Sequence, residues 1–375
     1  MEPRRRRQQP GRNALAREPL SLETRPPLTG STVDRFKPSA WLRSAHLQSI
    51  LPSLPPRSVF TRYRARALRR AGQPLILECE NGARLRAWHN RSASSQGRLA
   101  VLLHGWEGSS ESCYVLSLGT RLLAEGYDLL RLNLRDHGGT QALNHGLFHS
   151  CRLDDVLGAL RAAAQRFGAT PLYLAGFSLG GNFMLRAAAE PALPASVAGV
   201  VAISPVLDPA RTLSALEDGT RLYHDYFVRK WSASLRIKQQ HWPGDYDFSE
   251  RMSSRNLRRM TDELVCAHTD FPDMRCYLDG YAITGARLQT LQVPARILAA
   301  VDDPIIPAAE LAQLAPTKLL QVECTAHGGH CGFLNTWFGP SYCDGYVLEQ
   351  FAQFAAADAA SGGTAAGGAT RISAA

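Results

Sequence analysis

The sequence predicts an α/β fold in which a mostly parallel sheet is flanked by helices. Three observations support this. Short apolar runs alternate with helical segments of about 10–16 residues between positions 99 and 204, the pattern of a parallel sheet covered on both faces. A hairpin signal precedes the alternation. A stretch of about 80 residues, rich in arginine and aromatic residues, interrupts it before it resumes at position 295. We interpret this stretch as a helical cap inserted over the strand ends.

The hairpin is centred on an Asn81-Gly82 pair, a strong turn signal between two strands. Behind it, each apolar run ends near a glycine or a polar residue, as expected of buried strands. The helix over 152–167 carries apolar residues at a spacing near 3.6. The predicted strands are 75–79, 85–89, 99–105, 128–134, 171–177, 197–204, 295–301 and 319–325, and the predicted helices are 110–125, 152–167, 179–189, 308–314 and 345–356.

The composition fits one domain with a full core. The chain has 375 residues, of which 45% are hydrophobic. We predict a disordered basic tail over 1–35, one domain over 36–356 with the cap near 207–290, and a disordered low-complexity tail over 357–375. No internal repeat is visible.

The charge distribution argues against a nucleic-acid partner. The net charge is +9, and residues 1–35 contribute eight arginines against four acids. We interpret the remainder as spread over the chain without a long basic block, so no nucleic-acid surface is predicted. The four arginines at Arg4–Arg7 leave peripheral contact with a membrane surface open.

The chain is predicted to be cytoplasmic. It has no run of 18 apolar residues that could span a membrane, and its first residues lack the apolar core of a secretory signal. Its eight cysteines are scattered without a C-x-x-C pair, which favours free thiols in a reducing compartment. Neither a metal-ligand motif nor a dinucleotide or P-loop motif follows any predicted strand, so no metal and no cofactor are expected.

Gly176-Phe177-Ser178-Leu179-Gly180 fits the G-x-S-x-G pattern between a predicted strand and a predicted helix. This is the context of the nucleophile elbow of the α/β-hydrolase fold. The tight turn needs small residues two before and two after the serine, and both are glycine. Ser178 is therefore the predicted nucleophile.

The base and the acid should follow in the order Ser, Asp or Glu, His. His327 and His330 both follow the last strand, and we choose His330 because the glycines before it let it reach back over the strand ends. The acid should follow the strand at 295–301. Asp303 fits because it comes three residues after the small residue Ala300, and Asp302 is the alternative.

An oxyanion hole needs two backbone N–H donors directed at one point. One is expected from Leu179, directly after the nucleophile. The other is expected from the loop that begins His104-Gly105, where Trp106 is the predicted donor. The alternative is that Trp106 only packs in the pocket wall.

Five segments together resemble the YheT-like α/β-hydrolases, bacterial relatives of the animal ABHD1 and ABHD3 group. The segments are Phe36-Lys37-Pro38 with Ser44-Ala45-His46-Leu47-Gln48-Ser49-Ile50, His104-Gly105-Trp106-Glu107-Gly108-Ser109, the elbow through Asn182, Asp302-Asp303-Pro304, and Gly328-Gly329-His330-Cys331-Gly332-Phe333. The resemblance covers roughly residues 36–356. It departs at Arg135-Asp136-His137-Gly138-Gly139, where the family carries R-G-x-x-G, and at Tyr277 and Tyr281, which replace an adjacent Tyr-Tyr pair.

The resemblance implies hydrolysis of carboxylic esters, including lipid-like acyl esters, through an acyl-enzyme. Two alternatives remain at this point: acyl transfer by the same residues to an alcohol or amine, and a non-catalytic binding protein that keeps the fold. Dehalogenase and epoxide-hydrolase chemistry are disfavoured, because both need an aspartate at the position of Ser178.

Overall fold

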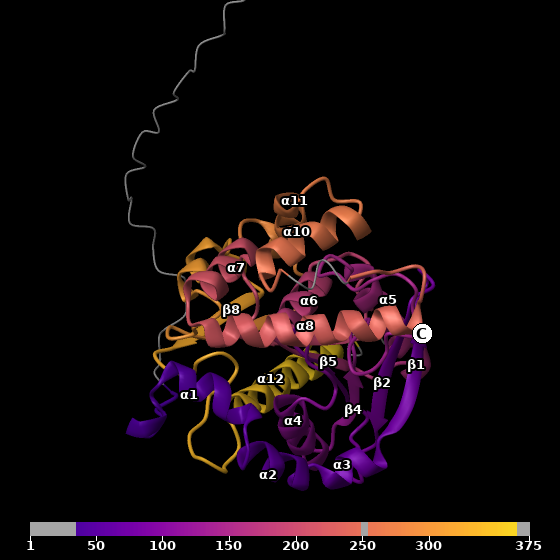
Figure 1. Cartoon of the computed structure of the whole chain (residues 1–375). Coiled ribbons are helices and arrows are strands. Elements are labelled where there is room, and N and C mark those ends of the chain that lie inside the picture. Colours follow the sequence, from indigo (N-terminus) through magenta and orange to yellow (C-terminus); the bar gives the residue numbers. More distant parts are fainter. Residues whose placement is uncertain (1–34, 249–253, 366–375) are drawn as a thin grey trace, which may run out of the picture.

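The computed structural model of the protein describes residues 35–248 and 254–365 (Figure 1). An eight-stranded sheet runs through its centre in the order β1-β2-β4-β3-β5-β6-β7-β8. Only β2 runs against its neighbours, and all other adjacent pairs from β4 to β8 are parallel. The strands are β1 (Gln73–Glu78), β2 (Arg84–Asn90), β3 (Leu99–Leu103), β4 (Asp128–Leu132), β5 (Leu172–Phe177), β6 (Val197–Ile203), β7 (Ala295–Ala300) and β8 (Leu320–Thr325).

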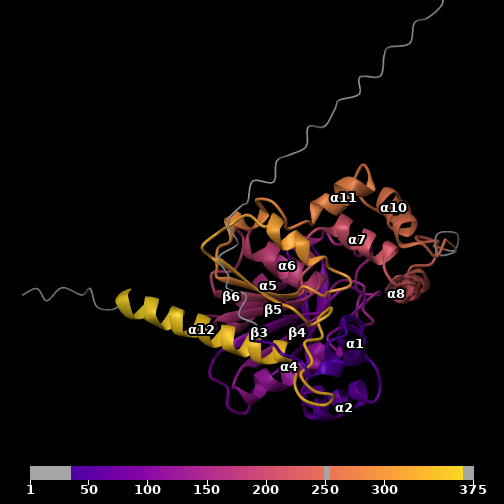
Figure 2. The ribbon, with the colours of Figure 1, turned by 90° about the vertical axis from the view of Figure 1, so that its left-hand side faces the viewer.

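Helices cover both faces of the sheet, as the alternating pattern predicts. Figure 2 shows α4 (Cys113–Ala124) and α12 (Tyr342–Ala365) below the sheet and α5 (Leu153–Phe167) and α6 (Leu179–Ala188) above it. The central strands β3 and β5 are buried along their whole length because both of their faces are covered. This explains why they read as continuous apolar runs.

The predicted helical insertion is present between β6 and β7. It holds α7 (Pro209–Asp218), α8 (Arg221–His241), α10 (Leu257–His268) and α11 (Met274–Gly280). In Figure 1, α7, α10 and α11 lie at the top of the molecule, and α8 crosses the middle of the view. Side-chain caps explain where three of these helices begin. The carboxylate of Asp208 accepts from the backbone N–H of Ala210, and Asn256 and Asp273 cap α10 and α11 in the same way.

The structure departs from the predicted elements in three places. The helix α12 extends to Ala365, past the boundary at 357 that the sequence analysis gives for the C-terminal tail, and its alanines at 355–357, 359 and 360 favour this continuation. The helix predicted over 308–314 is a 3₁₀ helix, η4 (Ala308–Gln313). The rest of the predicted tails, 1–34 and 366–375, lies outside the described residues. Before the sheet the chain forms η1 (Ala40–Leu42), α1 (Ala45–Ile50), η2 (Leu51–Ser53), α2 (Arg57–Arg64) and α3 (Arg66–Ala71), which the sequence pattern did not predict.

None of the helices within residues 35–248 and 254–365 has the length and hydropathy needed to cross a bilayer.

Candidate active site

Ser178 lies at the sharp turn between β5 and α6, with a left-handed backbone of φ 52°. The flanking glycines are required by space. A Cβ on Gly176 would lie 2.4 Å from the carbonyl oxygen of Gly180, and a Cβ on Gly180 would lie 2.4 Å from that of His104. The elbow therefore packs backbone against backbone and raises the serine above the end of the sheet.

His330 lies within hydrogen-bond distance of both Ser178 and Asp303. The Nε2 atom of His330 is 3.0 Å from the Oγ of Ser178, and its Nδ1 is 2.9 Å from Oδ2 of Asp303. The other carboxylate oxygen of Asp303 accepts from the backbone N–H groups of Ile305 (2.8 Å) and Ile306 (2.9 Å). These two bonds orient the carboxylate toward the imidazole.

Asp302, the alternative acid, lies close to His327, the alternative base. Oδ1 of Asp302 accepts from the backbone N–H of Gly329 at 2.8 Å, and its Oδ2 is 3.6 Å from Nδ1 of His327. Asp302 therefore supports the loop that carries His330, and it is Asp303 that contacts the imidazole.

Two opposing effects act on the imidazole of His330. Its burial favours the neutral ring, whereas the charge of Asp303 and its hydrogen bond favour the imidazolium, together with Cys331. The net result is a pKa well above the usual 6.5. The carboxylate thus stabilises the positive charge that the ring acquires when it takes a proton.

The loop after β3 packs directly against the serine. A Cβ on Gly105 would lie 3.1 Å from the Cβ of Ser178, a contact tight enough to displace the serine side chain slightly. Among the described residues, no acceptor is found for the backbone N–H of Trp106 or of Leu179. An oxyanion hole needs N–H donors that no other acceptor occupies, and these two groups meet that condition.

The buried His104 fixes this loop. Its Nε2 accepts from the backbone N–H of Leu134 at 3.1 Å, so Nδ1 carries the proton and donates to the carbonyl of Gly105 at 2.7 Å. Burial, together with the neighbouring His137, lowers the pKa of His104 to about 3. The ring stays neutral and links the loop after β3 to the loop after β4.

A buried glutamine holds the loop of His330, and we did not predict this role from the residues. The side chain of Gln48 in α1 donates to the carbonyl of Leu334 at 3.0 Å and accepts from the backbone N–H of the same residue at 2.6 Å. The neighbouring Ser49 accepts from the backbone N–H of His330 at 2.8 Å. The segment was visible in the sequence only through its family resemblance.

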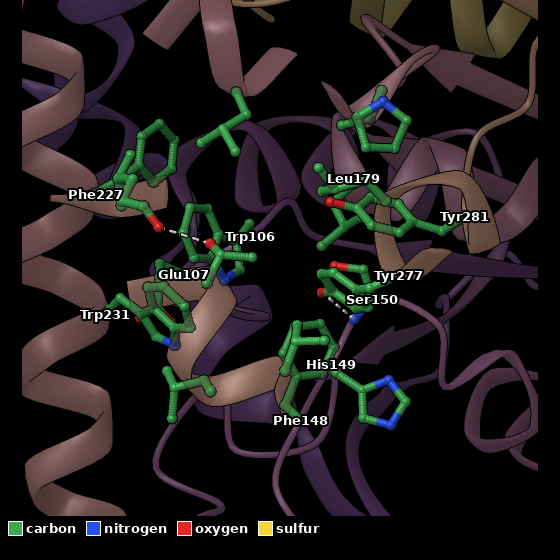
Figure 3. Close-up of a pocket in the computed structure, with 18 of the residues that line it drawn as sticks. Trp106, Glu107, Phe148, His149, Ser150, Leu179, Phe227, Trp231, Tyr277 and Tyr281 are labelled. Atoms are coloured by element: carbon green, nitrogen blue, oxygen red, sulfur yellow. Dashed lines mark hydrogen bonds between the residues drawn. The ribbon is translucent and has the colours of Figure 1, made fainter. Parts of the chain in front are cut away.

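A cavity of about 140 Å³ opens beside Ser178 and reaches under the cap. Figure 3 shows Trp106 with Phe227 and Trp231 of α8 on one side, and Tyr277 and Tyr281 on the other. Trp106 stacks on Phe227 with ring centroids 5.1 Å apart. Aliphatic side chains from the cap complete the lining: Leu213, Leu216, Leu257, Leu264 and Val265.

Glu107 is the acidic group of this lining that follows Trp106 (Figure 3). Burial raises its pKa to about 7, against a partial lowering by Lys230. Its backbone is left-handed, with φ 55°. The carboxyl group is therefore largely uncharged below neutral pH and suits the apolar surroundings. No group of three or more potential metal ligands is found in the described parts of the chain.

Residues 100–336 match the family model described as alpha/beta hydrolase fold. The chain belongs to this family. It is 28% identical to the Escherichia coli (strain K12) protein named Putative esterase YheT over 317 residues, which cover 81% of this chain and 88% of YheT. It is 26% identical to human protein ABHD15 over 336 residues, which cover 84% of this chain and 68% of ABHD15. The predicted resemblance to YheT-like α/β-hydrolases is thereby confirmed.

Among solved structures, the chain resembles the esterase Pf2001 of Pyrococcus furiosus with a TM-score of 0.50 and 14% identity. The alignment covers 76% of this chain and 89% of the esterase. At this identity the likeness shows the shared α/β-hydrolase fold.

Both departures from the family pattern lie around the cavity of this α/β-hydrolase. Asp136 pairs with Lys238 of α8 at 3.0 Å and also accepts from the backbone N–H of Phe148 at 2.8 Å. Tyr277 of α11 and Tyr281, directly after its end, are separated in sequence, but their ring centroids lie 5.3 Å apart. The hydroxyl of Tyr277 accepts from the backbone N–H of Ser150 at 3.1 Å.

Proposed function

We propose that this α/β-hydrolase is a serine esterase in which Ser178 is the nucleophile, His330 the general base and Asp303 the orienting acid. The observation that carries the proposal is the continuous contact from Asp303 through His330 to the Oγ of Ser178, with distances of 2.9 and 3.0 Å. A serine hydroxyl is weakly acidic, and it needs such a base to attack an ester.

In the acylation step, Nε2 of His330 takes the hydroxyl proton of Ser178 while Oγ bonds to the ester carbonyl carbon. The carbonyl oxygen becomes an oxyanion, which accepts from the backbone N–H groups of Trp106 and Leu179. The imidazolium, paired with Asp303, then gives its proton to the leaving alcohol oxygen. The carbon–oxygen bond of the ester breaks, and an acyl-enzyme remains on Ser178.

In the deacylation step, His330 takes a proton from water, and the water oxygen attacks the acyl carbon. The second oxyanion occupies the same two N–H donors. Return of the proton to Oγ of Ser178 releases the carboxylic acid. Asp303 keeps Nδ1 of the imidazole protonated throughout, so that Nε2 is free to accept at each step.

The lining of the cavity supports an apolar acyl group in the substrate. Five aliphatic side chains of the cap and the aromatic pair of Trp106 and Phe227 face it. Burial of each methylene in such a lining is worth about 0.8 kcal/mol. We therefore propose esters of small molecules or lipid-like acyl esters as substrates.

The free state of all eight cysteines supports a reducing compartment, and we propose the cytoplasm as the location.

Turnover of p-nitrophenyl esters of increasing chain length tests the proposal, with Ser178→Ala as the matched variant. We expect hydrolysis by the protein and no turnover above background by Ser178→Ala. A fluorophosphonate probe should label the protein and not the variant. Absence of labelling would favour the alternative of a non-catalytic binding protein. Formation of a new ester when an alcohol is added would instead favour acyl transfer.

A further inference from the structure

The first helices of the protein carry a concentrated positive charge. Residues 35–77 contain eight arginines and one lysine, and no aspartate or glutamate. The charge outside the N-terminal tail, interpreted above as spread without a long basic block, is therefore concentrated in this segment. With Arg35 counted in that tail, residues 36–77 alone carry +8, whereas 36–375 carry +5, so the rest of the domain is negative. Among the described residues, Arg43, Arg62, Arg64, Arg66 and Arg70 are exposed and form no ion pair.

The same helices expose large apolar side chains. Val59 is 61% exposed and Tyr63 is 62% exposed, one helical turn apart on α2. Trp41, Leu54 and Phe60 are exposed beside them. A core-facing helix would bury these side chains, so their exposure on one short segment indicates a surface with a partner.

A second segment extends this apolar surface. The aromatic rings form a chain of contacts from Trp41 through Trp337 and Phe338 to Phe60, with centroids 5.6, 6.2 and 5.2 Å apart. The guanidinium group of the buried Arg57 donates to the carbonyl oxygens of Trp337 and Gly339 and so holds this loop against α2. The loop is thus built to present its rings next to the basic helices.

We propose that α2, α3, Trp41 and the loop 336–339 form a docking surface for a membrane that carries anionic lipids. Exposed aromatic and aliphatic side chains enter the headgroup region, and flanking arginines pair with lipid phosphates. The arginines lie next to the aromatic rings of the surface. The guanidinium of Arg66 stacks on the ring of Tyr63 at 4.2 Å, and that of Arg64 lies 5.7 Å from the ring of Phe60.

The aliphatic members of the surface distinguish a lipid partner from a nucleic acid. A single strand would use aromatic rings for base stacking and a groove that follows the backbone. Leu54 and Val59 have no ring to stack on a base, and burial in hydrocarbon is the interaction that would stabilise their exposed side chains.

The helix α1, which precedes α2 in the chain, contacts the cap. Nδ1 of His46 in α1 is 2.9 Å from the hydroxyl of Tyr223 in α8, the helix that forms one wall of the cavity. In both views, α2 lies on the side of the molecule away from α7 and α11 (Figures 1 and 2). A membrane bound at α2 therefore leaves the outer cap helices in water.

Flotation of the full chain with lipid vesicles tests the proposal. We expect binding to vesicles of phosphatidylcholine and phosphatidylglycerol at about 7:3, and weak binding to phosphatidylcholine alone. Arg64→Glu/Arg70→Glu should reduce the bound fraction at least ~10-fold, since each basic residue contributes attraction. High salt screens the attraction between arginines and lipid phosphates. Val59→Ser/Tyr63→Ser should therefore reduce the vesicle binding that remains at high salt. Neither variant should change turnover of a short soluble ester, which separates this proposal from the proposed function.

Arg211→Glu/Arg275→Glu is the control, because it makes the same charge change at exposed positions in the cap. Equal loss of vesicle binding in this control would overturn the proposal, as would unchanged binding of Arg64→Glu/Arg70→Glu. Binding to a single-stranded oligonucleotide without binding to vesicles would also overturn it. So would a protein that does not bind vesicles and forms a dimer, if Val59→Ser/Tyr63→Ser converts that dimer to monomers.

Discussion

Gln48 and Leu334 are joined by two hydrogen bonds across 286 positions of sequence, one in each direction between the side-chain amide and the backbone. Gln48 is fully buried, and the neighbouring Ser49 holds the backbone N–H of His330. The position of the proposed base therefore depends on α1, a helix that lies outside the sheet and the cap.

Removal of these bonds should slow the chemistry. We expect Gln48→Ala to lower kcat of the esterase by about 10–100-fold with a smaller change in KM, because the imidazole loses its alignment. The free energy of unfolding should decrease by about 1–3 kcal/mol, since the backbone groups of Leu334 lose their partners. Kinetics and thermal denaturation measure the two effects. Exposed Gln96 provides the control, as Gln96→Ala; equal kinetics of the two variants would contradict the positioning role.

The pH profile tests the pairing of His330 with Asp303. The neutral imidazole is the base, so kcat/KM should fall as pH drops through a pKa that lies above 6.5. Asp303→Asn removes the charge that raises the pKa of His330, while burial, which lowers that pKa, remains. The fall of kcat/KM on the acid side of the pH profile (the acid limb) should therefore move to lower pH. The rate should fall by about 10⁴-fold. Asp302→Asn is the matched control and should keep the wild-type limb; a shifted limb there would assign the role to Asp302.

The sheet and the elbow could be predicted because their signals are local. An apolar run of five or six residues marks each central strand, and the glycines around Ser178 are demanded by contacts within the turn. The choice between Asp302 and Asp303 could not be made in this way. Both aspartates contact the same loop, and only the folded structure shows that Asp302 binds Gly329 whereas Asp303 contacts His330.

Contacts between distant segments explain what the sequence did not reveal. The role of Gln48 requires the position of Leu334, and the wall of the cavity requires α8 to lie over Trp106. The basic segment was visible in the sequence, since five of the nine residues from 62 to 70 are arginine, but the apolar loop 336–339 beside it comes from a distant part of the chain.

A larger side chain in the cap should shorten the accepted acyl chain. Leu264 of α10 lines the cavity, and Leu264→Trp would fill part of it. We expect kcat/KM for long-chain esters to fall by about 10–100-fold while acetate esters are affected little, since a few methylenes lose their contacts. An ester chain-length panel measures this. Leu222→Trp, at an exposed position on α8, is the control; an equal loss at every chain length in Leu264→Trp would contradict a role in acyl binding.

The carboxyl group of Glu107 should make stability depend on pH. Burial raises its pKa to about 7, from 4.5 in the unfolded chain. Between these values the folded protein holds a proton that the unfolded chain has lost, so stability falls as pH rises. Glu107→Gln removes this effect, and the free energy of unfolding of the wild type should decrease by up to about 3 kcal/mol more than that of the variant from pH 4.5 to pH 8. Denaturant titrations at both pH values measure it, and parallel curves would contradict the assignment.

The buried pair of Lys238 and Asp136 should hold α8 in place over the cavity. The ammonium group lies 3.0 Å from Oδ1 of Asp136 and also donates to the carbonyl of Gly146 at 3.3 Å, with almost no exposure to solvent. Lys238→Met leaves the carboxylate buried without its cation, which should cost about 3–5 kcal/mol of stability.

Because α8 carries Phe227 and Trp231, Lys238→Met should also raise KM for apolar esters and expose the cap to limited proteolysis. Arg236→Met, which removes a positive charge at an exposed position on the same helix, is the control. Lys238→Met/Asp136→Leu removes both charges and should recover much of the stability, because no unpaired charge remains buried. If the double variant were less stable than Lys238→Met, the buried charge of Asp136 would not be the cause of the loss.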